Sequence, residues 1–276
     1  MLNSEYINQQ SNYLLSCGIS NAKNEIIWYI EEKLKLNKND YLKFQIKFLT
    51  IETKNLIDNF INLRKKNIPY QYIMQKVDFF GKEFHIDNRA LIPRVETETI
   101  IRYLLSKNKY NNVLEVGVGS GVISSMISLL AIGEKILATD ISKPALQLAK
   151  KNISYHNIQN ISLLRHNILQ ETFHKKFDLI ISNPPYISSS DFNNLDVSIK
   201  KFEPREALTD ESDGLIFYRR FSKIIKNILN SGGVFYCEIG LPSSFKDIES
   251  IFSLNYSIKK IYDLNNDPRF LEIKCL

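Results

Sequence analysis

The chain has 276 residues, of which 44% are hydrophobic and 24% charged; this excludes a disordered chain and allows one large domain or two smaller ones. No apolar run reaches the roughly 18 residues that span a bilayer, and the polar start lacks the pattern of a signal peptide, so we expect a cytoplasmic protein with no membrane partner. The formal charge of +6 is spread along the chain and only weakly indicates a polyanionic partner.

Cysteine and histidine usage argues against a disulfide framework and against a metal site. The three cysteines, Cys17, Cys237 and Cys275, are odd in number and far apart in the chain. The four histidines show no ligand spacing such as H-E-x-x-H. We therefore expect neither a structural nor a catalytic metal.

The first 75 residues have a helical pattern. Apolar side chains recur at three- and four-residue steps within 26–34 and again within 56–61, and the polar run 37–40 has the composition of a turn. The pattern predicts an N-terminal domain over residues 1–75, built as a small bundle of about four helices.

Residues 76–92 are predicted to link this bundle to a second domain. Two short aromatic-rich runs lie on either side of Gly81, which is typical of a β-hairpin and of a natural hinge. Pro93 then starts a helix that we expect to run from about residue 96 to about residue 106. The second domain would accordingly cover residues 93–276.

From residue 111 onward the pattern alternates between strand and helix. Such alternation predicts the α/β class, with a mostly parallel Rossmann-like sheet and helices on both of its faces. Two late segments, 256–261 and 271–275, are candidates for an antiparallel edge. The strands are expected at 113–116, 136–139, 161–164, 177–181 and 234–239, and the helices at 122–132, 144–154 and 215–229.

A glycine-rich loop follows the first of these strands and opens a helix. Its run is Gly117-Val118-Gly119-Ser120-Gly121, in which the glycines let the backbone turn sharply and approach a ligand closely. The spacing is G-x-G-x-G and not the G-x-G-x-x-G of dinucleotide enzymes. The loop therefore indicates a nucleotide-like ligand, and a tight turn without a ligand is the alternative.

Two acidic residues are expected beside this loop. Asp140 ends the next strand, where a carboxylate can accept both hydroxyls of a ribose, although it could instead only cap the following helix. Glu115 precedes the loop and could bind a cationic or amino group, or it could be a strand-end charge exposed to water. Both are candidates for binding a cofactor.

The most specific signal is Asn183-Pro184-Pro185-Tyr186, directly after the strand 177–181. An amide nitrogen is a poor nucleophile, so a site that methylates it must hold both N–H groups and aim the nitrogen at the methyl donor. The Asn183 side chain and the Pro184 backbone offer two carbonyl acceptors, on a backbone that Pro185 keeps extended. Tyr186 offers a flat face for a planar amide or base. The alternative is a Pro-Pro turn that only ends a strand.

With these segments in order, the chain resembles the HemK family of release-factor glutamine N5-methyltransferases over nearly its whole length. Leu91-Ile92-Pro93-Arg94 with Glu96-Thr97-Glu98 is similar to the family's L-I-P-R-x-E-T-E signature. Other similar segments are Pro69-Tyr70-Gln71-Tyr72-Ile73, Phe79-Phe80-Gly81, Glu203-Pro204, Ala207-Leu208, Asp213-Gly214-Leu215 and Glu238-Ile239-Gly240.

The resemblance implies a class I methyltransferase that uses S-adenosyl-L-methionine to methylate the glutamine of the Gly-Gly-Gln motif in bacterial peptide chain release factors. The N-terminal domain would contact that protein substrate, and we expect a monomer. Residues 183–186 would hold the glutamine, with Asn183, Pro184 and Tyr186 catalytic and Pro185 also in contact. The implied cofactor-binding residues are Glu115, Gly117, Val118, Gly119, Ser120, Gly121, Asp140, Ile168 and Asn183.

Some positions depart from the family pattern without removing a proposed catalytic group, so they bear on cofactor affinity more than on reaction type. We expect Arg94 to position the linker or to pair with Glu96 or Glu98, and direct contact with the substrate is the alternative. The departures are Val95 in place of Pro, Glu115 in place of Asp, Asn167-Ile168 in place of Asp-Trp, and Leu241-Pro242-Ser243 in place of Gln residues.

Three other functions remain open from the sequence. A ribosomal-protein glutamine, or an exocyclic amine in RNA or DNA, would present similar N–H groups to the same residues. A duplex-DNA enzyme must flip a base and usually carries a recognition domain and a basic groove, so the small first domain and diffuse charge disfavour DNA, and RNA less strongly. A non-catalytic binding module on the same fold is the remaining alternative. We expect no direct nucleic-acid substrate.

Overall fold

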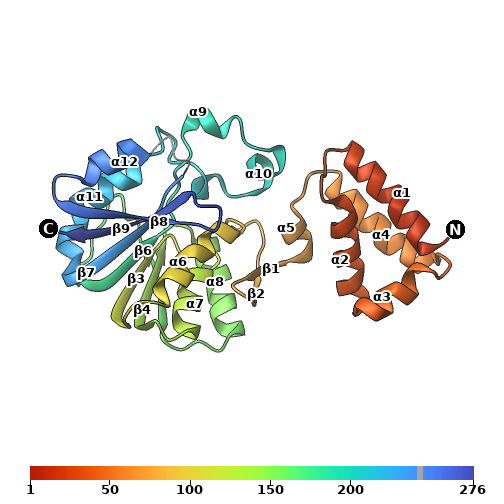
Figure 1. The fold of residues 1–276 in the computed structure, drawn as a ribbon, viewed down its shortest axis with the longest axis horizontal. Helices are drawn as coiled ribbons and strands as arrows, with labels where there is room; N and C mark the ends of the chain where they lie inside the picture. Colours follow the sequence, from red (N-terminus) through yellow and green to blue (C-terminus); the bar gives the residue numbers. More distant parts are fainter. Residues whose placement is uncertain (241–244) are drawn as a thin grey trace. The chain divides into compact units, whose positions relative to one another are not determined.

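The computed structural model describes residues 1–240 and 245–276, so the departure at Leu241-Pro242-Ser243 lies outside the described residues. By their contacts these residues divide into two compact units, each with its own core (Figure 1). The first unit comprises residues 1–75 with 197–202, and the second comprises residues 76–196 with 203–276.

The first unit is helical, and its residues 1–75 are drawn in red and orange in Figure 1. Its core is formed by apolar residues that recur on one face of each of the longer helices, among them the fully buried Ile26, Ile30, Ile57 and Phe60. The helices are α1 (Asn3–Ser16), α2 (Ala22–Leu34), α3 (Lys38–Gln45), α4 (Ile51–Arg64) and α5 (Tyr70–Met74), and α10 (Val197–Phe202) groups with them.

The run 37–40, expected as a turn, begins a helix instead. Asn37 precedes α3, and its side-chain oxygen accepts a hydrogen bond from the backbone N–H of Asp40 at 3.0 Å. Residues that favour turns also favour helix caps, because in both places a short polar side chain takes up a free backbone N–H. Within residues 1–75 the described helices are therefore α1 to α5, one more than expected.

Two contacts between α2 and later parts of this unit also fix its arrangement. Arg64, at the end of α4, donates from Nε to Glu25 Oε2 at 2.6 Å, and both side chains are nearly buried. Trp28 is the single tryptophan of the chain, and its ring meets the Tyr70 ring edge-on with the centroids 5.9 Å apart. Trp28 remains 47% exposed.

The second unit is built on a seven-stranded sheet in the order β5-β4-β3-β6-β7-β9-β8 (Figure 1). The first five strands in this order are parallel, whereas β9 is antiparallel to both β7 and β8. This confirms the predicted α/β class and the antiparallel edge. The strands are β3 (Tyr110–Val116), β4 (Gly133–Asp140), β5 (Ile161–Arg165), β6 (Phe177–Ser182), β7 (Leu229–Glu238), β8 (Tyr256–Tyr262) and β9 (Pro268–Cys275).

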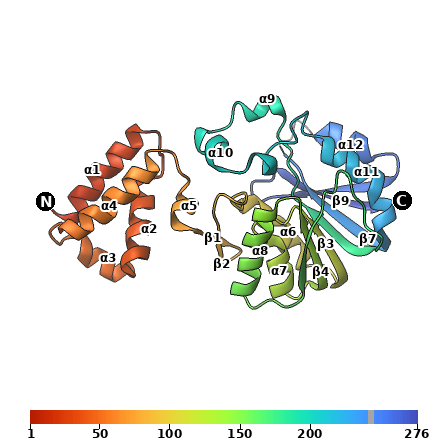
Figure 2. The ribbon, with the colours of Figure 1, turned by 180° about the vertical axis from the view of Figure 1, so that it is seen from behind.

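Helices cover both faces of this sheet (Figures 1 and 2). Successive residues of the central strands point to opposite faces, so Leu114 and Ile180 join one core while Val113 and Leu179 join the other. One face carries α6 (Glu98–Leu104), α7 (Val122–Leu129) and α8 (Lys143–Tyr155), and the other carries α11 (Ile216–Ile228) and α12 (Phe245–Phe252). The shorter elements are η1 (Val95–Thr97), α9 (Ser189–Phe192) and η2 (Arg205–Ala207).

The hairpin expected as a hinge belongs by its contacts to the second unit. Its strands are β1 (Lys76–Phe79) and β2 (Lys82–His85), and Phe79 and Phe84 are buried in the same core as α6 and α7. Helical structure after Pro93 begins only at Val95, because Arg94 is still extended, with φ −92° and ψ 145°. No helix in the described part of the chain has both the length and the apolar character to cross a membrane.

Candidate active site

A cavity lies at the carboxyl edge of the parallel strands, within the second unit. Its empty volume is about 1110 Å³, part of it open to solvent. The loops after β3, β4, β5 and β6 each supply part of its lining, as expected for a ligand site on a sheet of this kind. The sequence-predicted residues that line it are Glu115, Gly117, Val118, Gly119, Ser120, Asp140, Ile168, Asn183, Pro184 and Pro185.

The glycine loop depends on backbone angles that favour glycine. Gly117, Gly119 and Gly121 have φ values of +81°, +53° and +84°. Gly117 and Gly119 line the cavity, whereas Gly121 lies outside the lining residues. A Cβ at Gly121 would be 3.1 Å from the Cβ of Ala149, so Gly121 allows α7 and α8 to approach closely.

Asp140 holds the glycine loop and the start of the next helix together. One carboxylate oxygen accepts the Gly119 N–H and the other accepts the Ser142 N–H, each at 2.9 Å. Burial raises the pKa of Asp140, and these two hydrogen bonds oppose that shift. Asp140 therefore fixes both walls of this part of the cavity, and each oxygen keeps a second lone pair for a ligand hydroxyl.

Glu115 is almost completely buried, at 1% exposure, so it is not a strand-end charge exposed to water. Its Oε2 accepts the Ser124 N–H at 2.9 Å and also the Ser124 hydroxyl. Because Gly121 has no side chain to cap α7, the Glu115 carboxylate takes up one of the free N–H groups at the start of that helix. Burial raises the pKa of Glu115 to about 8.

Residues 183–186 leave the end of β6 and divide between two environments. Asn183, Pro184 and Pro185 line the cavity. In the described part of the chain the Asn183 side chain makes no hydrogen bond, so its oxygen keeps its full acceptor capacity. Tyr186 lies outside the lining residues, and its ring packs against Gly240, where an added Cβ would be 2.8 Å from the Tyr186 Cδ2.

The segment before α6 contributes Leu91, Pro93 and Arg94 to the cavity lining, and Glu203 holds this segment in place. Glu203 accepts the Ile92 N–H at 3.1 Å and the Arg94 Nη2 at 2.6 Å. The pairing of Arg94 with Glu96 or Glu98 is therefore wrong, whereas its other expected role, positioning the linker, stays a prediction. A pairing over 109 residues of chain cannot be read from local spacing, and these contacts explain why the backbone stays extended past Pro93.

Residues after β5 contribute an aromatic and apolar part of the lining. His166 and Ile168 line the cavity and are 8% and 5% exposed. The His166 ring stacks on Phe173 with the centroids 4.1 Å apart. Arg220 of α11 donates to the Ile168 carbonyl at 2.8 Å, so Ile168 occupies a fixed place although the family's usual Asp-Trp pair is absent.

Two residues near the cavity were not among the candidate site residues of the sequence analysis. Asn152 of α8 donates from Nδ2 to the carbonyls of His85 and Ser120, and its Oδ1 accepts the His85 N–H at 2.7 Å. A polar residue within the apolar stripe of a helix is a signal that could have identified it. Glu238, at the end of β7, is buried and accepts the hydroxyl of the cavity-lining Thr97 at 2.7 Å.

Among the residues that the structure describes, no group of three or more His, Cys, Asp or Glu side chains is arranged to hold a metal ion.

The raised pKa of Glu115 predicts a pH-dependent stability that Glu115→Gln should remove. Below pH 4.5 the carboxyl is protonated in both states, whereas between about pH 4.5 and about pH 8 only the unfolded chain ionises. Rising pH therefore favours unfolding of the wild type, by up to about 1.4 kcal/mol per pH unit. Denaturant unfolding at pH 5, 6.5 and 8 should show the wild type losing stability relative to Glu115→Gln. A constant difference between the two proteins would contradict the burial argument.

Comparison with known proteins shows which family the chain resembles. A family model described as Methyltransferase small domain matches residues 96–205. A release factor glutamine methyltransferase of Fusobacterium nucleatum is 34% identical over 275 residues, covering 96% of this chain and 77% of that protein. One of Streptococcus pneumoniae is 34% identical over 220 residues, covering 78% of each chain.

The fold also has solved counterparts. The crystal structure of a methyltransferase from Pyrococcus furiosus is 20% identical, with a TM-score of 0.54, and the match covers 76% of this chain and 96% of that one. At this identity the likeness concerns the fold alone. The relatives found by sequence show the family as well as the fold, because they are 34% identical over most of the chain. The chain therefore belongs to the HemK family of release factor glutamine methyltransferases.

Proposed function

We propose that this protein transfers a methyl group from S-adenosyl-L-methionine to the side-chain N5 of the glutamine in the Gly-Gly-Gln motif of peptide chain release factors. The observation that carries the proposal is the position of residues 183–185. They line the same cavity as the glycine loop and Asp140, at the carboxyl edge of the sheet. The names of the relatives support the choice of a release-factor glutamine as substrate.

The lining residues fit S-adenosyl-L-methionine by their chemistry. Gly117 and Gly119 let the loop backbone come close to a ligand, and the Asp140 carboxylate suits ribose hydroxyls. His166 and Ile168 give a flat, apolar surface for adenine. The acidic groups Glu115 and Asp140 suit a ligand that carries positive charge.

Bound S-adenosyl-L-methionine would supply an electrophilic methyl group on a sulfonium. The work of this chain is then to position the glutamine amide. Asn183 Oδ1 and the Pro184 carbonyl are the two acceptors we assign to the amide N–H groups, and both residues line the cavity. Methylation would break the bond between the methyl carbon and the sulfonium sulfur as the N–C bond forms. Positive charge would develop on the nitrogen, where these two oxygens stabilise it, and the nitrogen would then lose one of its protons to solvent.

The first unit is proposed to contact the release factor, residues 1–75 acting as the recognition domain. We further propose that the protein is a monomer and acts in the cytoplasm, where release factors are made. The proposed recognition domain ends at residue 75, where the contacts within the chain also separate the first unit from the second.

Methyl transfer to purified protein tests the substrate directly. Labelled S-adenosyl-L-methionine is incubated with the enzyme and a release factor, with a variant factor whose Gly-Gly-Gln glutamine is replaced by Ala, with ribosomal protein and with RNA. Label on the wild-type factor alone is the expected result. Label on ribosomal protein or RNA would keep the chemistry and overturn the substrate, and cofactor binding without transfer to any of them would favour a binding module.

Asp140→Asn should weaken cofactor binding. Both Asp140 oxygens accept backbone N–H groups, so an amide NH₂ in place of either oxygen would face another donor. We expect the Kd for S-adenosyl-L-methionine, measured by calorimetry, to rise by about 10-fold or more. Asp178→Asn is the matched control, because Asp178 also accepts a backbone N–H, from Asn112 at 2.8 Å, at the start of β6. Equal binding by both variants would count against the role of Asp140.

Asn183→Ala should slow methyl transfer without unfolding the protein. Loss of one of two acceptors lets the amide leave its aligned position, and misalignment of this kind costs about 10²-fold in rate. Single-turnover rates with saturating cofactor measure the effect, and Asn108→Ala, at an exposed position, is the control. A rate within a few-fold of the wild type would remove Asn183 from the proposed mechanism.

A further inference from the structure

Two glycines far apart in the sequence both contact Tyr186. An added Cβ at Gly214 would lie 2.4 Å from the Tyr186 carbonyl oxygen. An added Cβ at Gly240 would lie 2.8 Å from Cδ2, 3.3 Å from Cε2 and 3.4 Å from Cγ of the Tyr186 ring. Real Cβ atoms do not approach so closely, so neither place accepts a larger residue while Tyr186 stays where it is.

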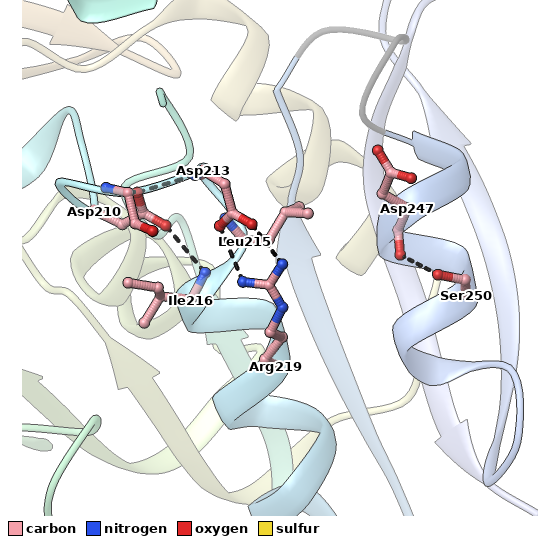
Figure 3. A network of polar contacts seen from close by, with 9 residues as sticks. Asp210, Asp213, Leu215, Ile216, Arg219, Asp247 and Ser250 are labelled. Carbon is pink, nitrogen blue, oxygen red and sulfur yellow. Dashed lines mark hydrogen bonds and ion pairs between the residues drawn. The ribbon is translucent and has the colours of Figure 1, made fainter. Parts of the chain in front are cut away.

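Gly214 is held against Tyr186 by the turn before α11. One oxygen of Asp210 accepts the N–H groups of Ser212 and Gly214, each at 2.9 Å, and the other accepts the Ile216 N–H at 3.0 Å. Figure 3 shows this carboxylate directed at the amino end of α11. Gly214 has a φ of +80°, which favours glycine independently of the close contact.

The same turn runs beside the residues that follow Tyr186. The Ile187 N–H donates to the Leu208 carbonyl at 3.1 Å, and the Ser189 N–H donates to the Ser212 carbonyl at 2.8 Å. These bonds tie the residues after Tyr186 to the turn that carries Gly214, so a shift that relieved the close approach of Gly214 would have to disturb them.

Gly240 follows the end of β7, where two hydrogen bonds hold the residues just before it. The Tyr218 hydroxyl of α11 donates to the Glu238 carbonyl at 2.9 Å, and Tyr218 is fully buried. The Ile239 N–H donates to the Arg269 carbonyl at 2.9 Å. With Glu238 and Ile239 both anchored, the backbone at Gly240 forms a fixed surface for one side of the Tyr186 ring.

We propose that Gly214 and Gly240 are positioning residues for methyl transfer, which act by fixing the backbone and the ring of Tyr186 and, through it, the acceptors Asn183 and Pro184. This inference rests on the proposed function. Tyr186 directly follows the three cavity-lining residues of its loop, so we expect a displacement of the Tyr186 backbone to move the carbonyl of Pro184 as well. Neither glycine lines the cavity, and the cofactor-binding loop does not include them.

The variants Gly214→Ala and Gly240→Ala, in the full chain, test the proposal. We expect kcat for release-factor methylation to fall by about 10²-fold in each, as misalignment predicts, with the Kd for S-adenosyl-L-methionine close to that of the wild type. Gly232→Ala controls for backbone strain, because Gly232 has a φ of +74° and open space around it. Gly133→Ala controls for overpacking, because its Cβ would be 2.7 Å from Val113 Cγ2 at the other end of the sheet. Losses of kcat as large in the controls would overturn the proposal.

A double-mutant cycle distinguishes action through the ring from general destabilisation. If Gly240 acts through Tyr186, then Gly240→Ala should cost little in a Tyr186→Ala background, because the clash is gone. A penalty that persists in that background would overturn the role assigned to Gly240.

Crystal structures separate a failure of this inference from a failure of the proposed function. Whatever substrate the enzyme uses, Tyr186 should be displaced in Gly214→Ala and in Gly240→Ala, and unmoved in the two controls. Tyr186 found in its original position in the test variants would overturn the inference even if the wild type methylates release factor. A displaced Tyr186 in a protein that transfers no methyl to release factor would support the inference and overturn the substrate.

Discussion

Loops at the carboxyl edge of the sheet leave some backbone N–H groups without a backbone partner, and carboxylates accept several of these groups. Glu115 does this for the start of α7, Asp140 for the glycine loop and Glu203 for the segment before α6. Asp210 does it for the turn before α11. Because the donors are backbone groups, each bond fixes the course of the chain and not only a side chain. The cavity walls are thus in place before a ligand arrives, as a reaction that depends on alignment requires.

The same arrangement gives the cavity its electrostatic character. Burial raises the pKa of Glu115 and Asp140, so these carboxyl groups ionise less readily than in water. A positively charged ligand beside them would favour the ionised forms, and its binding would release protons. The proposed cofactor carries both a sulfonium and an amino group. The acidic groups that support the loops would therefore also favour the ligand that the loops surround.

The sequence predicted the elements whose signals are local. Strand and helix alternation gave the parallel sheet, and the runs 117–121 and 183–186 lie where a strand ends, as expected. It could not predict contacts between distant segments, such as Arg94 with Glu203 or Gly240 with the Tyr186 ring. These contacts depend on which loops the fold brings together, and this cannot be predicted from the spacing of residues in the chain. For the same reason, local spacing assigned Arg94 the wrong partners.

The single tryptophan has a consequence for spectroscopy. Trp28 lies in the first unit, half exposed beside Tyr70, while every residue that lines the cavity belongs to the second unit. Intrinsic tryptophan emission therefore reports on the helical bundle. The second unit contains tyrosine but no tryptophan. Trp28 thus serves as an intrinsic fluorescent probe of the first unit. Its emission can follow an encounter at the bundle, while a labelled methyl group follows the chemistry, without any engineered probe.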